Sequence, residues 1–92
     1  MTEANSYYDG KVKSLGNKLN EKPFTVGVME PGNYTFKTST IEIMEVIHGE
    51  MEVTLPGKES KLFKKGDTFR IEKGEEFKLT VSAPVCYLCL YL

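Results

Sequence analysis

The stretch that decides the fold is EIMEVIHG, residues 42–49. Ile43 and Ile47 alternate with Met44 and Val46, a period of two residues that is typical of a β-strand and not of a helix. Neither face of this strand is purely polar. We therefore expect both of its faces to be covered.

The same alternation continues through the rest of the chain, and turn signals separate its segments. The strand-like segments are Phe24–Met29, Tyr34–Thr38, Met51–Leu55, Phe69–Ile71 and Phe77–Val81. About eight short strands at roughly ten-residue spacing favour an all-β sandwich or barrel, in which a jelly-roll closure protects the sheet edges. The Pro31-Gly32 pair predicts a hairpin between the first two segments.

Length and charge limit the classes of function. The chain has 92 residues, with Lys+Arg 12 against Asp+Glu 13 and a net charge of −1. We expect one domain over residues 1–92, and no nucleic-acid partner because no basic stripe is present. No apolar stretch reaches the length of a membrane span, and the polar N-terminus does not resemble a signal peptide. A soluble protein of the cytoplasm is the default expectation.

The cysteines and the histidine are not predicted to carry chemistry. Cys86 and Cys89 have C-x-x-C spacing, but they lie in an apolar terminal strand whose alternation sends them to opposite faces. We expect buried, inert thiols. His48 is the only histidine and is expected to be structural or on the surface, because one histidine cannot build a zinc site alone.

The positions of Glu42, Gly49, the Gly66-Asp67 turn, Gly74 and Phe77 resemble the two motifs of a cupin barrel. In metal-binding cupins, two histidines precede the glutamate and a third ends the second motif. Here the corresponding residues are Phe36, Thr38 and Phe77. The resemblance implies a single cupin or jelly-roll β-barrel that has kept its cavity and lost its metal.

The chain is more narrowly similar to the small cupin-type pyrimidine/purine nucleoside phosphorylases. The matching stretches are Tyr8 with Gly10–Ser14, Val26–Met29 followed by Gly32 to Met44, Gly49–Pro56, and Glu76-Phe77 with Tyr87–Cys89. Ile41 and Glu72 depart from the prolines expected there, which affects local loop geometry. The resemblance implies phosphate-dependent cleavage of purine and pyrimidine nucleosides to free base and pentose 1-phosphate, with broad specificity and without metal or organic cofactor.

Candidate substrate-binding residues follow from this resemblance. Glu42 is the catalytic candidate, because a carboxylate in a partly apolar cavity can stabilise positive charge on the sugar; the alternative is a glutamate paired with a lysine. Tyr34, Phe36 and Phe77 offer faces for a nucleobase, or else fill the space left by a metal site. The Thr38 hydroxyl can bind ribose or water, or cap a strand.

The phosphate ligand is the hardest assignment. Arg70 is the only arginine, and alternation with Phe69 and Ile71 points it either into the cavity or into solvent. Lys11 and Lys13 form the other basic group inside a family-like motif, and could reach a barrel mouth in the same or a neighbouring subunit. Two solvated lysines on an edge strand are the alternative.

Two other classes of function remain open from the sequence. The first is a non-catalytic cupin that binds a sugar or nucleoside, since no nucleophile with an adjacent base is recognisable. The second is an interaction module that associates through an apolar sheet face. Ile43, Ile47 and the Leu88, Leu90, Leu92 row are apolar where an outer face should be, and they predict a homodimer.

Overall fold

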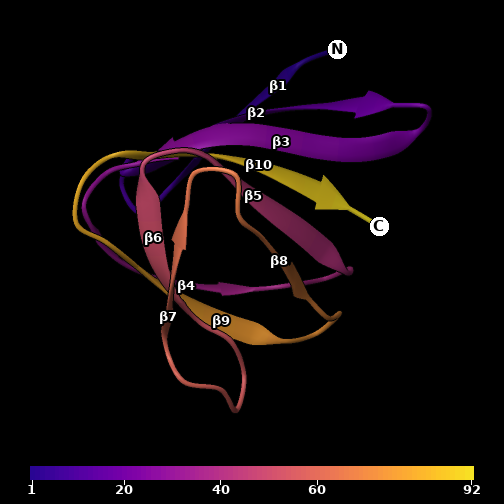
Figure 1. Ribbon diagram of the computed structural model, residues 1–92. Helices are drawn as coiled ribbons and strands as arrows, with labels where there is room; N and C mark the ends of the chain where they lie inside the picture. The colour runs from indigo at the N-terminus through magenta and orange to yellow at the C-terminus, as the bar shows by residue number, and fades with distance from the viewer.

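The computed structural model describes residues 1–92 and contains ten β-strands and no helix (Figure 1). The strands are β1 Glu3–Tyr7, β2 Val12–Leu19, β3 Lys22–Met29, β4 Gly32–Lys37, β5 Glu42–His48, β6 Glu50–Thr54, β7 Lys61–Lys64, β8 Thr68–Ile71, β9 Glu76–Val81 and β10 Val85–Tyr91. No helix is therefore long and apolar enough to cross a membrane.

The strands form two antiparallel sheets, which confirms the all-β jelly-roll expectation. One sheet has the order β1-β2-β3-β10-β5-β8, and the other has the order β4-β9-β6-β7. The two sheets face each other in Figure 1, and the inward side chains of both form one cluster of sixteen buried hydrophobic residues. The strand count exceeds the expected eight because residues before Phe24 form β1 and β2.

The hairpin predicted at Pro31-Gly32 is wrong. β3 lies in the six-stranded sheet and β4 lies in the four-stranded sheet. Both edges of β3 are already used, since Met29 pairs with Val12 on β2 and with Val85 on β10. The Pro-Gly pair instead carries the chain from one sheet to the other, and the Tyr34 hydroxyl holds this corner by donating to the Glu30 carbonyl at 2.5 Å.

The turn between β1 and β2 ties the two sheets together at one end of the barrel. Tyr8 and Asp9 adopt positive φ angles of 52° and 56° in this turn, a conformation that L-residues visit at a cost. The Tyr8 hydroxyl donates to the Thr35 carbonyl at 2.5 Å and accepts from the Thr35 amide at 3.0 Å. These two bonds fasten the N-terminal hairpin onto β4.

Gly27 gives the Tyr87 ring its place in the core. The two residues are paired on β3 and β10, and Tyr87 is 6% exposed. A Cβ atom at Gly27 would lie 2.7 Å from the Tyr87 hydroxyl and 2.7 Å from the Lys13 carbonyl oxygen. Only glycine therefore lets the tyrosine ring lie this close to β3.

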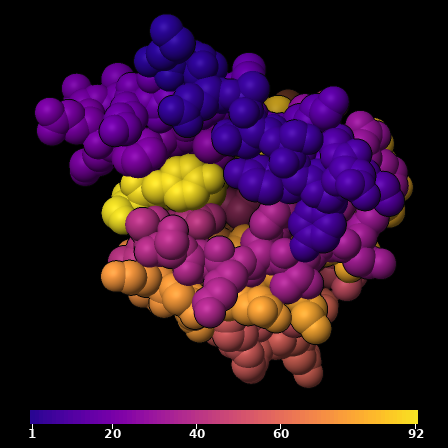
Figure 2. All heavy atoms as spheres, turned by 180° about the vertical axis from the view of Figure 1, so that it is seen from behind, coloured from indigo at the N-terminus to yellow at the C-terminus, as the bar shows by residue number.

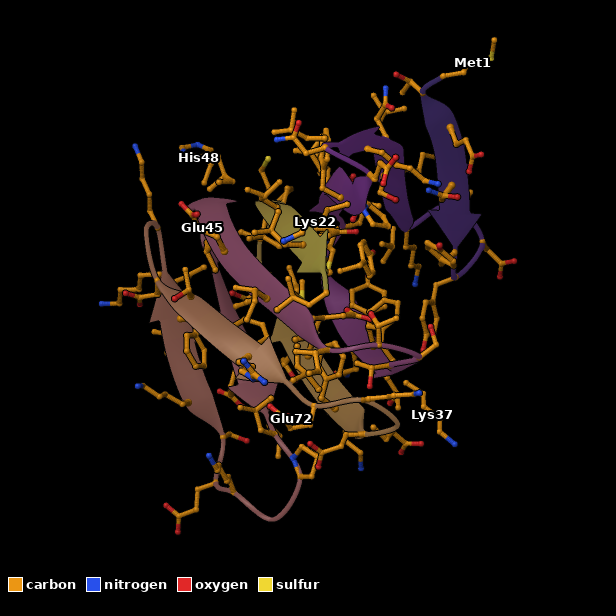
Figure 3. All side chains as sticks on the ribbon, turned by 90° about the vertical axis from the view of Figure 1, so that its right-hand side faces the viewer. Met1, Lys22, Lys37, Glu45, His48 and Glu72 are labelled. Atoms are coloured by element: carbon orange, nitrogen blue, oxygen red, sulfur yellow. The ribbon has the colours of Figure 1, made fainter.

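The structure tests the expectations for the cysteines and the histidine. Cys86 and Cys89 are free thiols on opposite faces of β10, as predicted. Cys89 is buried, but Cys86 is only half-buried, so the expectation of two buried thiols is wrong for Cys86. His48 is exposed at the end of β5, which confirms its surface position (Figure 3).

Candidate active site

A cavity of about 220 Å³ lies between the inner faces of the sheets, at the end that the Tyr8 turn covers. It is lined by Tyr7, Met29, Phe36, Lys37, Glu42, Met44, Phe77, Tyr87, Cys89 and Tyr91. Figure 2 shows a hollow on this side of the molecule, between the N-terminal segment in indigo and the C-terminal residues in yellow. Six strands contribute to its wall, namely β1, β3, β4, β5, β9 and β10.

Glu42 points into this cavity from the first position of β5. Its side chain is on the same face of the strand as Met44 and Val46, which are both buried in the core. The Cys89 thiol donates to Glu42 Oε1 at 3.4 Å. Because Cys89 is only 2% exposed, the carboxyl group that reaches it must be directed inward.

The surroundings of Glu42 disfavour charge. Burial raises its pKa above the ordinary glutamate value, and the Cys89 hydrogen bond only partly offsets this. Burial also raises the pKa of Cys89 and Tyr91, and raises the pKa of Tyr87 to about 12. Three neighbouring acidic groups are therefore neutral near pH 7.

Glu42 has no cationic partner. The chain contains one ion pair, between Arg70 and Glu72, and it is elsewhere. The alternative role of Glu42, a glutamate paired with a lysine, is thus not what the structure shows. Lys37 is the one basic residue that lines the cavity. It is exposed and extends into solvent beyond the end of β4, far from His48 (Figure 3).

Two of the predicted aromatic residues lie in the cavity. Phe36 and Phe77 line it with their ring centroids 6.0 Å apart and their planes tilted by 34°. Tyr7 meets Phe36 edge to face, with centroids 6.3 Å apart. Together they form an aromatic wall against which a flat ring can lie.

Tyr34 and Thr38 do not line the cavity, so their predicted contact with substrate is not supported. Tyr34 is 2% exposed, and its hydroxyl is used at the corner beside Glu30. Thr38 is 4% exposed; its hydroxyl donates to the Glu72 carbonyl at 2.6 Å and accepts from the Glu75 amide at 3.1 Å. Both side chains hold loops in place, as the structural alternative for Thr38 anticipated.

The predicted phosphate ligand Arg70 lies outside the cavity. Its side chain is on the outer face of β8, opposite to the buried Phe69 and Ile71. Its Nε donates to Glu72 Oε2 at 2.6 Å, and this bond lowers the pKa of Glu72. Alternation along the strand left two directions open for the Arg70 side chain. Because Phe69 and Ile71 pack in the core, the Arg70 side chain points into solvent.

Lys11 and Lys13 also lie away from the Glu42 cavity. Val12 and Ser14 of β2 point inward and are buried, so Lys13 between them is on the outer face of the six-stranded sheet. Lys11 is exposed in the turn before β2. Lys13 lines a separate, larger hollow of about 760 Å³ on that face. This hollow contains no carboxyl group and no aromatic ring. The smaller cavity, which holds the ionisable cluster, is therefore the candidate active site.

Several residues of the cavity were not predicted from the sequence. They are Tyr7, Met29, Lys37, Met44, Tyr87, Cys89 and Tyr91. Alternation from Glu42 would have placed Met44 beside it, and alternation along the last strand would have grouped Tyr87, Cys89 and Tyr91. Tyr7 had no such signal, because the polar β1 segment does not alternate.

Fold and cavity together define a small cupin-type barrel with a single carboxyl group and aromatic walls. The Vibrio parahaemolyticus protein VPA0057 has the same structure, with a TM-score of 0.97, 39% identity, and coverage of 100% of this chain and 99% of the other. The iron-containing HppE enzyme superposes with a TM-score of 0.83 at 9% identity, over 99% of this chain and 56% of the other, which indicates a shared fold alone.

The sequence comparisons identify the family. The family model described as pyrimidine/purine nucleoside phosphorylase matches residues 2–91. A Saccharophagus degradans pyrimidine/purine nucleoside phosphorylase is 45% identical, over 100% of this chain and 99% of the relative. The chain belongs to the pyrimidine/purine nucleoside phosphorylase family. It is an enzyme that cleaves nucleosides with phosphate, so the non-catalytic binding protein and the pure interaction module are set aside.

Proposed function

We propose that phosphorolysis takes place in the Glu42 cavity and that the enzyme accepts both purine and pyrimidine nucleosides. The observation that carries this proposal is the inward carboxyl of Glu42 in a cavity walled by Phe36 and Phe77. Stacking against an aromatic ring depends little on which base is stacked. The polar groups of the cavity are one carboxyl, one amine, one thiol and three tyrosine hydroxyls, without the arginine or amide side chain that reads one base through a pair of hydrogen bonds. Broad base specificity follows.

The size of the cavity supports placing only the base inside it. Its volume of about 220 Å³ is below the ~300–1,000 Å³ typical of small-molecule sites. The flat base fits between the aromatic walls, and the ribose and the phosphate lie at the mouth. Tyr7 covers the base from the N-terminal hairpin, which Tyr8 anchors.

Lys37 replaces Arg70, Lys11 and Lys13 as the phosphate ligand in this proposal. It is the cation at the mouth of the cavity and has no ion-pair partner. A phosphate beside the ribose needs such a charge. Lys37→Ala should raise the KM for phosphate about tenfold and leave the KM for nucleoside nearly unchanged. Lys11→Ala is the matched control, and an equal effect of both changes would return the assignment to the N-terminal segment.

Metal independence and the absence of an organic cofactor are part of the proposal. Phe36, Thr38 and Phe77 stand where metal-binding cupins have histidines, and Glu42 with Cys89 gives two potential ligands where a bound ion needs three or more. Phosphorolysis of uridine and adenosine should require orthophosphate and should be unchanged by prior dialysis against a chelator. Activity that is lost on chelation and restored by one metal would contradict this.

We further propose a homodimer formed through the outer face of the six-stranded sheet. Its exposed apolar residues are Leu15, Val26, Val28, Ile47 and Leu90, between 37% and 51% exposed. Leu15 pairs with Val26, and Val26 with Leu88, so the row is continuous over three strands. A patch of this kind is typical of an interface.

The dimer is tested by charge insertion on that face. Leu90→Glu should convert a dimer to a monomer in light scattering at micromolar concentration. Leu62→Glu, on the outer face of β7, is the control because Leu62 is similarly exposed, at 44% against 41% for Leu90. A wild-type protein that is monomeric in the same light-scattering measurement would contradict the dimer. A cytoplasmic location is consistent with the two free cysteines, and fractionation of cells would test it.

A further inference from the structure

We infer that Glu42 works as a neutral carboxylic acid that gives its proton to the departing base, and not as a carboxylate that faces the sugar cation. This inference rests on the proposed cavity and specifies which side of the substrate Glu42 serves. Its carboxyl reaches inward to the buried Cys89 thiol. The space it faces is the aromatic space that fits a base.

The charges around Glu42 favour the acid form. The titratable groups that face it are Tyr87, Cys89 and Tyr91 from β10, Tyr7 from β1 and Lys37 from β4. Arg70 of β8 is turned to the outside, where Glu72 holds it. Only Lys37 is cationic, and it is exposed and beyond ion-pair distance. Burial accordingly raises the pKa of Glu42.

The second substrate strengthens this preference. Orthophosphate enters as a dianion, and one cation at the mouth does not neutralise two negative charges and a carboxylate. Bound phosphate therefore raises the pKa of Glu42 further, because like charges disfavour ionisation. The phosphate itself supplies the negative charge next to the sugar. What the reaction still lacks is a proton for the leaving base.

An oxygen of HPO₄²⁻ forms a bond to C1′ of the pentose, and the C1′–N bond breaks with its electron pair going to the base. The Glu42 proton moves to the base, at N7 of a purine or O2 of a pyrimidine. The products are a neutral base, a pentose 1-phosphate monoanion and the Glu42 carboxylate. The total charge is −2 before and after the step.

The test compares guanosine with 7-methylguanosine, whose base leaves in a neutral form because N7 already carries a methyl group and a positive charge. General acid catalysis commonly contributes about 10²–10⁴-fold. Glu42→Gln should therefore slow the turnover of guanosine by about 100-fold or more, and slow that of 7-methylguanosine by less than about tenfold. Circular dichroism and melting verify that the variant is folded.

The outcomes separate this inference from the proposed site. A large and equal loss on both nucleosides would overturn the acid role and favour the charged carboxylate. Near-wild-type turnover of both would remove Glu42 from the reaction, and with it the proposed cavity. Wild-type activity that rises toward high pH, where Glu42 is ionised, would also overturn the acid role if it is compared at equal HPO₄²⁻ concentration.

A measurement that does not depend on turnover supports the kinetic test. The chain is 10.4 kDa, so the side-chain carboxyl ¹³C signals of its glutamates can be titrated by NMR with and without inorganic phosphate. Glu42→Gln identifies the Glu42 signal by its absence. We expect Glu42 to titrate above the other glutamates and to shift upward when phosphate is added. A Glu42 signal that titrates below them, with no response to phosphate, would overturn the inference.

Discussion

Removal of the Tyr8 hydroxyl is the most direct test of how the N-terminal hairpin is attached to the barrel. Tyr8→Phe keeps the ring, which meets Tyr34 and Phe36 edge to face, and removes both hydrogen bonds to Thr35. A hydrogen bond contributes about 0.5–1.5 kcal/mol net. The two bonds lie in an exposed setting, where water can replace them, so we take the lower end of the range for each.

The expected loss is therefore about 1 kcal/mol in the free energy of unfolding. For a domain of 60–100 residues this corresponds to a melting temperature lower by about 4–8 °C. Tyr7→Phe is the matched control, because the structure gives the Tyr7 hydroxyl no hydrogen bond, and its melting temperature should stay near that of the wild type. Calorimetry measures both variants.

The same variant has a functional consequence. Tyr7 lines the cavity and precedes the anchor directly, so a loosened turn positions Tyr7 less well over the base. The KM for nucleoside should rise a few-fold in Tyr8→Phe, with kcat nearly unchanged. If Tyr8→Phe has the melting temperature and the nucleoside KM of the wild type, other contacts hold the hairpin, and the two hydrogen bonds of Tyr8 do not anchor it.

Three further predictions concern packing and charge. Gly27→Ala should cost about 1–3 kcal/mol, because its Cβ overlaps the Tyr87 ring and a backbone oxygen, whereas Gly16→Ala should be milder in the same melting assay because its Cβ meets nothing closer than 3.4 Å. Burial raises the folded-state pKa of Glu42, so Glu42 stabilises the fold below the ordinary glutamate pKa, and this stabilisation is lost as the pH rises through the raised pKa. From pH 4 to 8, the melting temperature of Glu42→Gln should therefore rise relative to that of the wild type. A difference in melting temperature that does not change with pH would contradict this. Arg70→Ala should leave the KM for phosphate unchanged, since the guanidinium pairs with a neighbour outside the cavity, and a clear rise would restore it as a ligand.

The sequence placed only a part of the cavity, namely Phe36, Glu42 and Phe77. Period-two alternation put Cys86 and Cys89 on opposite faces, and the same rule, if applied to Glu42, would have put Met44 beside it. It left Arg70 undecided, because alternation orders side chains on two faces without saying which face is the core. The direction of Arg70 is known only from the structure, which shows that its neighbours Phe69 and Ile71 are buried.

Pairings between distant strands could not be read from the chain. The Pro31-Gly32 pair predicts a turn correctly, yet whether the turn makes a hairpin or a crossing depends on whether β3 has a free edge. β2 and β10 occupy both edges. Likewise, the sequence allows Thr38 to be a substrate ligand, whereas in the structure its hydroxyl is hydrogen-bonded to the loop of residues 72–75.

The sequence by itself determined the all-β class, because local alternation sets it, and the membership of the nucleoside phosphorylase family, because residues along nearly the whole chain match that family. The same match made Glu42 the catalytic candidate. The tertiary structure alone decided that Glu42 faces Cys89 without a cation, that Tyr7 and Lys37 join it, and that Arg70 does not. The physical reason is that burial and the pKa of Glu42 depend on β1, β4 and β10, which the chain brings together only on folding.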